Sequence, residues 1–390
     1  MSDVRHWLQL SLTKGIGPIL ARRLIEKAGS VAAACSANVA LLRTVEGIGT
    51  AAANGIADSL GSGASAAARE LEKAAAAGVQ IFCMEDEPYP LLLKEIPDPP
   101  LVLYVRGTLE PRDLHAVAIV GSRKCSIYGR EQAERFGALL AGAGVCVVSG
   151  GARGIDSAAH RGALQPLNGR TIAVLGCGVD VAYPPENAQL FLEIARDGRG
   201  AVVSEYPMGT EPRAENFPRR NRLISGMSRG VLVVEADVRS GALITARQAV
   251  DDHGRTVFAL PGRVDNAMSA GPHQLIRDGA TLVTRLEDIL EGLSPLPVSA
   301  TQPTLFDAES EADRPGIEVD AAVRAAVTSP KTELSNARQR ILGAVDGAEL
   351  DADAIINETG LAAQVVMQEL TLMTLKGLIR KVDATRFSKR

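Results

Sequence analysis

The chain has 390 residues, of which 46% are hydrophobic and 23% charged, and its formal net charge is −4. This length suffices for two or three domains with buried cores, and no apolar run approaches the roughly 20 residues of a membrane-spanning helix, so we expect a cytoplasmic protein without a membrane segment. The five cysteines are far apart and the five histidines lack ligand spacing, which predicts no disulfide framework, no metal site and no cofactor.

Composition divides the chain into three domains and a linker. Residues 1–77 are predicted to form a helical domain, residues 78–293 a larger α/β domain, and residues 334–390 a small C-terminal domain. Residues 294–333 between them are rich in Pro, Ser, Thr, Ala and acids, without apolar periodicity, which is typical of a flexible acidic linker. The acids of this linker offset a basic C-terminal tail, so the net charge does not exclude nucleic acid as a partner.

The first domain contains a repeat. Gly15-Ile-Gly17 and Gly47-Ile-Gly49 each lie between two predicted helices, where glycine permits a tight hairpin and leaves backbone N–H groups facing solvent. We predict two helix-hairpin-helix units, which resemble modules that hold DNA phosphates without sequence preference. Since the hairpins contain little positive charge, a purely structural bundle is an equally good interpretation, and these four glycines are candidate accessory contacts to DNA.

Six short apolar runs in the α/β domain alternate with helical patterns such as 129–140 and 243–252. The runs end in glycine, a polar residue or an acid, and span residues 116–120, 145–149, 171–175, 201–204, 231–234 and 256–260. Near-continuous apolar strands alternating with helices predict a doubly wound, Rossmann-like α/β fold whose parallel sheet is covered on both faces. Ligands of such sheets bind outside the carboxyl ends of the strands.

Two glycine-rich loops at that edge are candidate phosphate sites. Gly121-Ser122-Arg123 follows the first strand and Gly150-Gly151-Ala-Arg153-Gly154 follows the second. N–H groups at a helix N-terminus, exposed by residues without a Cβ, bind phosphate.

A third candidate is the stretch 213–225, which we interpret as a loop with four arginines around one aromatic residue. Such a loop suits phosphate contacts and one stacked base, and its candidate residues are Arg213, Phe217, Arg220, Asn221 and Arg222. The alternative is a solvated basic helix face with Phe217 in the core.

Other chemistries are less well supported. The chain lacks a complete dinucleotide fingerprint and a P-loop, and residues 226–230 match a nucleophile elbow only in letters, because they follow a helix and precede a strand.

Two alternative functions stay open. One is an enzyme acting on a phosphorylated nucleotide, of the phosphoribohydrolase type, with Glu205 and Glu235 as acid or base. The other is a DNA-binding regulator acting through the C-terminal domain.

Six motifs, in order, resemble the DNA-processing protein A (DprA/Smf) family over residues 80–290: Ala118-Ile-Val-Gly-Ser-Arg123, Ser149-Gly-Gly-Ala-Arg-Gly-Ile-Asp-Ser-Ala-Ala-His160, Ile172-Ala-Val-Leu-Gly-Cys-Gly-Val-Asp180, Tyr183-Pro-Pro-Glu-Asn187, Asn216-Phe-Pro-Arg-Arg-Asn-Arg-Leu-Ile224 and Ser240-Gly-Ala-Leu-Ile-Thr-Ala246. The resemblance implies a non-catalytic homodimer that binds and protects single-stranded DNA and helps to load RecA recombinase during natural transformation. It also implies that Arg123, the glycine loops and the 217–222 segment form the strand-binding pocket. The family often has lysine shortly before that phenylalanine, where this chain has Arg213.

The C-terminal domain is predicted to be a winged helix. Its helices are expected at 337–345, 352–359 and 362–375, with a wing hairpin at 378–382 and 385–388, and its buried stripe comprises Val365, Val366, Leu370 and Met373. Arg380 and Lys381 are candidate accessory DNA contacts. The third helix contains no arginine or lysine, so contact with a protein, or a scaffold role, is favoured over DNA binding.

One peptide of the linker motivates a separate hypothesis. Gln302-Pro-Thr-Leu305-Phe306 resembles the Gln-x-x-Leu-Phe peptide by which bacterial replication proteins dock on the sliding clamp. Flexible segments suit such weak contacts, so the sliding clamp is a candidate partner.

Overall fold

The computed structural model describes residues 4–196, 198–293, 340–341, 343–344, 350–360, 366, 370, 379–381 and 386–389. The chain divides into two compact units, Met1–Pro303 and Thr304–Arg390. The clamp-like peptide with Gln302, Leu305 and Phe306 lies outside the described residues, as does the segment predicted to be an acidic linker.

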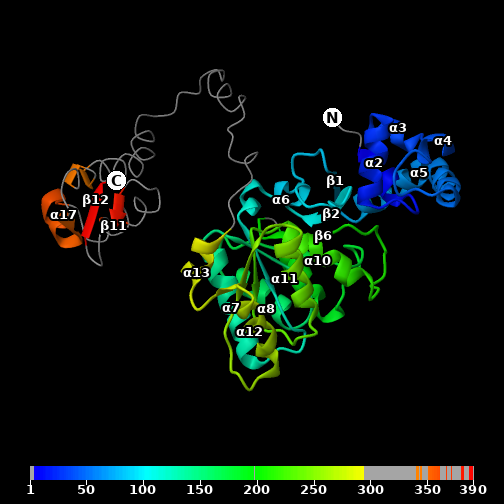
Figure 1. The fold of residues 1–390 in the computed structure, drawn as a ribbon. Coiled ribbons are helices and arrows are strands. Elements are labelled where there is room, and N and C mark those ends of the chain that lie inside the picture. The colour runs from blue at the N-terminus through cyan, green and yellow to red at the C-terminus, as the bar shows by residue number, and fades with distance from the viewer. Residues whose placement is uncertain are drawn as a thin grey trace, which may run out of the picture. The chain divides into compact units, whose positions relative to one another are not determined.

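The first unit begins with helices, drawn in blue in Figure 1: α1 (Val4–Leu12), α2 (Pro18–Ala28), α3 (Val31–Cys35), α4 (Val39–Leu42) and α5 (Thr50–Ala76). The two Gly-Ile-Gly sequences connect α1 to α2 and α4 to α5. Gly15 and Gly47 have φ angles of 84° and 95°, which glycine alone adopts readily, and Ile16 and Ile48 are buried. Both hairpins therefore lie where the repeat predicts them.

The described residues of this unit form a nine-stranded sheet in the order β1-β2-β6-β5-β4-β3-β7-β8-β9. Its strands are β1 (Gln80–Cys83), β2 (Val102–Gly107), β3 (Ala116–Val120), β4 (Cys146–Ser149), β5 (Thr171–Val174), β6 (Gly200–Ser204), β7 (Gly230–Val233), β8 (Thr256–Ala259) and β9 (Thr281–Leu282). The six predicted strands, β3 to β8, are all present and parallel. The sequence analysis missed β9 and the antiparallel pair β1 and β2.

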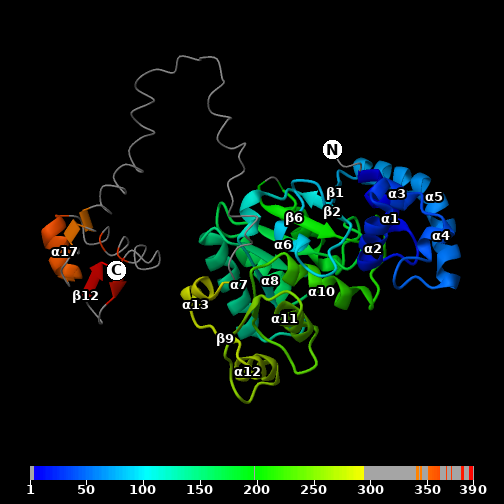
Figure 2. The same ribbon diagram turned by 45° about the horizontal axis from the view of Figure 1, so that its top comes forward.

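Helices cover both faces of the sheet (Figures 1 and 2): α6 (Leu91–Lys94), α7 (Ile127–Gly142), α8 (Ile155–Ala163), α9 (Ala188–Ile194), α10 (Asn216–Gly226), α11 (Gly241–Asp251), α12 (Ala270–Arg277) and α13 (Leu286–Gly292). Successive side chains of β3, which point to opposite faces of the sheet, show this directly. Val117 and Ile119 belong to the same hydrophobic core as α7 and α8, whereas Ala118 and Val120 belong to the core that contains α10 and α11. The predicted doubly wound, Rossmann-like fold is confirmed.

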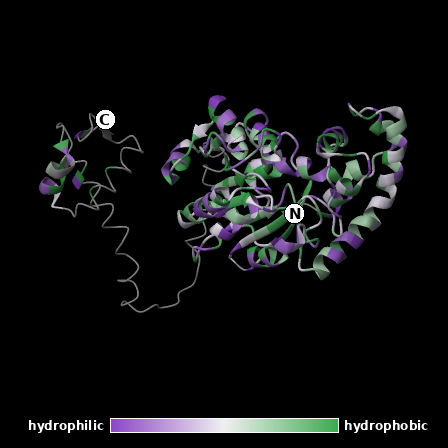
Figure 3. Cartoon of the chain, turned by 90° about the horizontal axis from the view of Figure 1, so that it is seen from below, coloured by the Kyte–Doolittle hydropathy of each residue, from purple (hydrophilic) through white to green (hydrophobic). Residues whose placement is uncertain are grey.

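The N-terminal helices share a core with the sheet. Leu8, Leu24 and Leu60 pack in one cluster with Val102 and Tyr104 of β2. A buried polar contact reinforces this junction, because the Glu70 carboxylate on α5 accepts a hydrogen bond of 2.6 Å from the backbone N–H of Met208, in the loop between β6 and α10. In Figure 3 the strands are largely green, and the helices around them show both colours, as expected for amphipathic cover.

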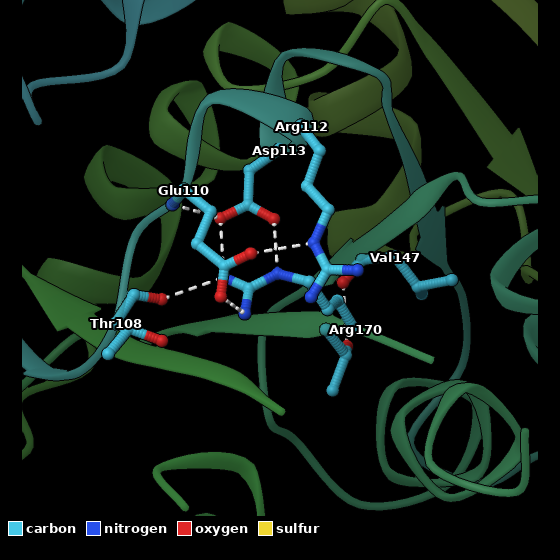
Figure 4. Close-up of polar contacts among 7 residues, drawn as sticks. Thr108, Glu110, Arg112, Asp113, Val147 and Arg170 are labelled. Atoms are coloured by element: carbon cyan, nitrogen blue, oxygen red, sulfur yellow. Dashed lines mark hydrogen bonds and ion pairs between the residues drawn. The ribbon is translucent and has the colours of Figure 1, made fainter. Parts of the chain in front are cut away.

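A buried ionic cluster lies at the amino ends of the parallel strands (Figure 4). Arg170, which directly precedes β5, is only 3% exposed, and its guanidinium contacts Glu110 at 2.6 Å and Asp113 at 2.7 Å. It also donates to the carbonyl oxygen of Thr108 at 2.9 Å. The cluster thereby fastens the short 3-10 helix Pro111–Leu114, which leads into β3, to the start of β5.

The second unit contains β10 (Leu350–Asp351), α17 (Ala352–Thr359), β11 (Ile379–Lys381) and β12 (Arg386–Lys389), with the strands in the order β10-β12-β11. Gly360, with a φ of 62°, ends α17 as predicted, and β11 and β12 form the predicted wing hairpin. Val366 and Leu370 are buried with Ile341 and Ile355. Val365, Met373 and most of the predicted third helix lie outside the described residues, and β10 was not predicted.

Among the residues that the structure describes, no helix combines the length and apolarity that crossing a bilayer would require.

Candidate nucleic-acid interface

The loops that follow β3 and β4 pack tightly against each other at the carboxyl edge of the sheet. A Cβ on Gly121 would lie 2.5 Å from Ile155 Cγ1 and 2.8 Å from the carbonyl oxygen of Glu235, and a Cβ on Gly154 would collide with the carbonyl oxygen of Ser122. Gly154 also has a φ of 76°. The two loops can approach each other this closely only because both positions are glycine. The loop after β3 therefore packs against the start of α8.

Arg123 extends from this loop over an aromatic side chain. Its guanidinium carbon lies 5.2 Å from the centroid of the Phe217 ring, and that of Arg220 lies 6.0 Å from the same centroid. The Tyr183 ring is 5.5 Å from Phe217, at an interplanar angle of 36°. Within the described residues Arg123 is exposed and forms no ion pair, so its charge is available to an anionic ligand.

Arg220 lies beneath this cluster and is only 4% exposed. Its guanidinium donates to the carbonyl oxygens of Gly150, at 2.7 Å, and Val174. Burial lowers the pKa of Arg220 to about 10, a shift that the Asp156 carboxylate opposes, so the group stays cationic at neutral pH. Burial also raises the pKa of Asp156, against the effect of Arg220.

Gly150 has a packing role that was not predicted. A Cβ at this position would lie 2.7 Å from a guanidinium nitrogen of Arg220 and 2.7 Å from a carboxylate oxygen of Asp156. Its lack of a side chain therefore leaves space for the Arg220 guanidinium and the Asp156 carboxylate, in addition to any exposure of its backbone N–H.

Six of the predicted site residues line one pocket of about 660 Å³, within the usual size range of ligand sites: Gly121, Ser122, Arg123, Phe217, Arg220 and Asn221. We call this the sheet-edge pocket. Its wall also contains Lys124, Tyr183, Arg239 and the N-terminus of α11 at Ser240 and Gly241, none of which was predicted as a site residue. The loop after β7 could have been found by the same pattern, because it too follows a parallel strand and carries an arginine.

Three other predicted residues lie outside this pocket. The exposed Arg153 pairs with the exposed Glu186 of the loop before α9, with one N···O distance of 3.1 Å. Gly151, with a φ of 65°, packs against the Phe191 ring, which a Cβ would approach to 2.8 Å. Arg213 is exposed between Pro212 and Ala214, which do line the pocket. None of these three residues lines the sheet-edge pocket, although Arg213 lies between two residues that do.

The stretch 213–225 is a loop only up to Glu215, because α10 begins at Asn216. Pro218 is tolerated since it occupies the first helical turn, where its missing N–H has no partner to lose. The Asn216 side chain donates to the carbonyl oxygen of Gly176 at 3.1 Å and fixes this start.

Arg222 lies on the same helix, but two carboxylates neutralise its charge, so it is not available to bind an anion. Its guanidinium is 2.9 Å from Asp98 and 2.6 Å from Glu205, and the residue is only 8% exposed. Arg220 and Arg222 therefore differ in environment although both belong to α10, and only Arg220 lines the sheet-edge pocket.

The two acids considered for catalysis have structural partners. Glu205 pairs with Arg222, as described above. Glu235 accepts hydrogen bonds from the backbone N–H of Ser126, at 2.7 Å, and from its hydroxyl, at 2.6 Å, at the N-terminus of α7. Residues 226–230 run from the end of α10 into β7, so the prediction that they are no nucleophile elbow is confirmed.

The accessory candidates are dispersed. Gly17, at the N-terminus of α2, lines a second pocket with residues of α10, but Gly15, Gly47 and Gly49 do not line the sheet-edge pocket. Arg380 and Lys381 lie on strand β11 of the second unit.

The first unit is thus a Rossmann-like α/β protein with a cationic pocket at the carboxyl edge of its sheet. Residues 80–294 match the family described as DNA recombination-mediator protein A, and residues 325–384 match the DprA winged helix domain. The chain is 35% identical over 401 aligned residues to Protein Smf of Synechocystis sp., covering 100% of this chain and 99% of that one. The chain therefore belongs to the DNA recombination-mediator protein A (DprA/Smf) family.

A further match, to a curated sequence and to a solved structure, bears the name DprA. The DNA processing protein DprA of Streptococcus pneumoniae is 46% identical over 209 residues, which cover 54% of this chain and 72% of that one. The X-ray structure of DprA from the same organism matches with a TM-score of 0.65 and 34% identity, and covers 76% of this chain and 100% of that chain.

Proposed function

We propose that this protein binds single-stranded DNA in the sheet-edge pocket and does not act on it chemically. One observation carries the proposal: Arg123 is exposed and lacks a carboxylate partner among the described residues, yet it is held in place over the Phe217 ring. A positioned and unneutralised guanidinium suits a phosphate, which it binds through parallel hydrogen bonds. Membership of a family of DNA-processing proteins supports nucleic acid as the source of that phosphate.

The composition of the pocket wall favours a strand over an isolated phosphate. Lys124 and Arg239 add two exposed cations beside Arg123, and the N-terminus of α11 faces the same space. Several cations in one groove suit successive phosphates, whereas the aromatic pair Tyr183 and Phe217 suits an unpaired base. Binding should therefore weaken steeply as salt increases, because each neutralised phosphate releases counterions.

Catalysis is not part of the proposal, because Glu205 is paired with Arg222 and Glu235 accepts two hydrogen bonds from Ser126. The alternative, a phosphoribohydrolase-type enzyme, requires one of these carboxylates to exchange a proton with substrate. Release of free base from a nucleoside monophosphate by the purified protein would support that alternative.

The wider role follows from the family resemblance. We propose that the protein acts in the cytoplasm as a homodimer, protects incoming single strands and helps to load RecA recombinase on them during natural transformation. The winged helix is proposed to contact a protein or to serve as scaffold rather than to read an operator. Preference for one duplex sequence would favour the regulator alternative.

The sliding clamp stays a separate hypothesis that depends on the linker peptide alone. Unchanged clamp binding by a variant carrying both Leu305→Ala and Phe306→Ala would dispose of it.

The test of strand binding is a salt titration with single-stranded and duplex oligonucleotides. The Arg123→Ala variant should bind single strands about 10- to 100-fold more weakly, since charge-assisted hydrogen bonds contribute roughly 1.5–3 kcal/mol. Arg135→Ala is the matched control, because Arg135 is also exposed and lies 5.7 Å from the centroid of an aromatic ring, that of Phe136, but does not line the pocket. Equal affinity of both variants and the wild-type protein would refute the proposal.

A further inference from the structure

A second pocket of about 740 Å³ adjoins the sheet-edge pocket, and we call it the hairpin pocket. Its wall combines the first Gly-Ile-Gly hairpin, at Gly17 and Pro18, with the residues that precede β2 and with the exposed sides of α10 and α11. Pro218 of α10 and Ile244 of α11 line both pockets. A ligand chain that occupies the sheet-edge pocket can therefore continue directly into the hairpin pocket.

Two polar atoms of the hairpin pocket have no partner. Arg222 and Gln248 both line it, and within the described residues neither Nη1 of Arg222 nor Oε1 of Gln248 forms a hydrogen bond, although both atoms are buried. Arg222 itself is 92% buried, as its exposed fraction of 8% implies. An unpaired buried polar group destabilises the folded state, so a donor and an acceptor left together in one pocket indicate a ligand that supplies both complements.

The charges of the hairpin pocket argue against phosphate as that ligand. The Asp98 and Glu205 carboxylates belong to the same wall, where they contact Arg222, and together they balance Arg222 and the exposed Arg219, so the wall has no net positive charge to attract an anion. Most of the remaining wall is apolar or flat, with Ile16, Leu101 and Tyr206 among its members. Such a wall suits a planar, neutral and partly apolar group.

A nucleobase has these properties. Each base carries a hydrogen-bond acceptor next to a donor on its Watson–Crick edge, and its faces stack on apolar and aromatic side chains. The Nη1 of Arg222 can donate to the base acceptor, and the Oε1 of Gln248 can accept from the base N–H. Since a duplex uses the Watson–Crick edge internally, only an unpaired base can make both contacts.

We propose that the hairpin pocket receives one nucleobase of the strand whose phosphates lie in the sheet-edge pocket. The inference rests on the proposed binding of single-stranded DNA and adds a base-recognition subsite to it. It also gives the first Gly-Ile-Gly hairpin a role as a wall of this subsite. The preference for unpaired strands then arises from recognition of a free base edge as well as from the flexibility of the strand.

The experiment compares two strands of about 12 nucleotides, oligothymidylate and its N3-methyl analogue, on the full chain. The methyl group removes the base N–H donor at every position and leaves the backbone charge unchanged, so the register of binding does not matter. Wild-type protein should bind the methylated strand about 5- to 10-fold more weakly. The Gln248→Leu variant should bind unmodified oligothymidylate more weakly and should lose this discrimination.

Two control variants separate the inference from the proposed function. Gln274→Leu removes an exposed glutamine of α12 that lines neither pocket and should keep the discrimination, and Arg123→Ala should bind both strands weakly but still distinguish them. Equal binding of both strands by wild-type protein, or discrimination that persists in Gln248→Leu, would overturn the base subsite while strand binding stands. Failure of wild-type protein to bind oligothymidylate at all would overturn both.

Discussion

The two edges of the parallel sheet use arginine in opposite ways. At the amino edge, Arg170 is buried between Glu110 and Asp113, and every guanidinium nitrogen has a partner. At the carboxyl edge, Arg123 is exposed, lies on an aromatic ring and has no carboxylate partner among the described residues. The comparison indicates that neutralised arginines hold the sheet together, whereas arginines without an acidic partner are available to a polyanion.

Arg222 shows that the distinction depends on partners and not on position along the chain. It lies two residues from Arg220 on α10, but it meets the carboxylates of Asp98 and Glu205, which belong to distant segments. Arg220 instead meets backbone carbonyls and a single acid, Asp156. The helix α10 thus contributes the neutralised Arg222 and the exposed Arg219 to the hairpin pocket, and the cationic Arg220 to the sheet-edge pocket.

The largest expected effect concerns the amino edge. Arg170→Met should lower the free energy of unfolding by about 3–5 kcal/mol, because it leaves the nearly buried Asp113 carboxylate without its cationic partner. Denaturant unfolding measures the change, and the folded fraction should keep wild-type affinity for single strands. Arg112→Met, which removes an exposed partner of Glu110, should cost less than about 1 kcal/mol. Loss of strand affinity in folded Arg170→Met would break the comparison between the edges.

A smaller effect is expected from His160, which is fully buried and bonded to Thr171 at the start of β5 with a distance of 2.7 Å. Burial lowers its pKa from 6.5 to about 3. Between these two pH values the imidazole is protonated in the unfolded chain but stays neutral in the folded chain. The free energy of unfolding should therefore decrease by about 1 kcal/mol per pH unit as the pH falls from 6.5 toward 3.

Unfolding of wild-type protein and His160→Gln across this pH range tests the assignment. The variant should be less stable at pH 7 but should lose stability more slowly on acidification. Some slope should persist, because burial also lowers the pKa of His253, to about 4. Parallel curves for the two proteins would contradict the assignment to His160.

The smallest expected effect sharpens the comparison at the carboxyl edge itself. Arg153 is exposed there but paired with Glu186, so it resembles the amino-edge arginines in having an acidic partner. Glu186→Gln should release its charge and tighten single-strand binding about twofold, with a slightly steeper salt dependence. Glu193→Gln, on a partly exposed acid of the neighbouring α9, is the control. Unchanged affinity in Glu186→Gln would place Arg153 beyond the reach of the strand.

The sequence predicted the sheet and the centre of the site for clear physical reasons. Strands covered on both faces need apolar residues at nearly every position, which made β3 to β8 visible as continuous runs. Gly121 and Arg123 were found because they follow such a strand. The strands β1 and β2 do not alternate with long helices, so they were not recognised as part of the sheet. The strand β9 has only two residues, too few to form a recognisable run.

The environment of each arginine could not be predicted in the same way. Whether a guanidinium meets a carboxylate depends on residues far away in the chain, such as Asp98 for Arg222 and Glu186 for Arg153. Arg239 and Lys124 differ in this respect, because each lies in a loop that follows a parallel strand, so their place at the carboxyl edge could have been predicted. Which basic side chains pair with acids, and which can bind an anion, is determined only by the folded structure.

The hydrogen bond between Glu70 and the backbone of Met208 has a kinetic consequence. It ties the long helix α5 to the loop that leads into α10, and we expect it to restrain that loop relative to the N-terminal helices. A strand that enters such a preformed channel needs no hinge motion of the protein, and the ordering cost of binding falls mainly on the DNA. Association should then be governed by electrostatic encounter, with a rate constant that falls with ionic strength and changes little with solvent viscosity beyond the diffusional effect.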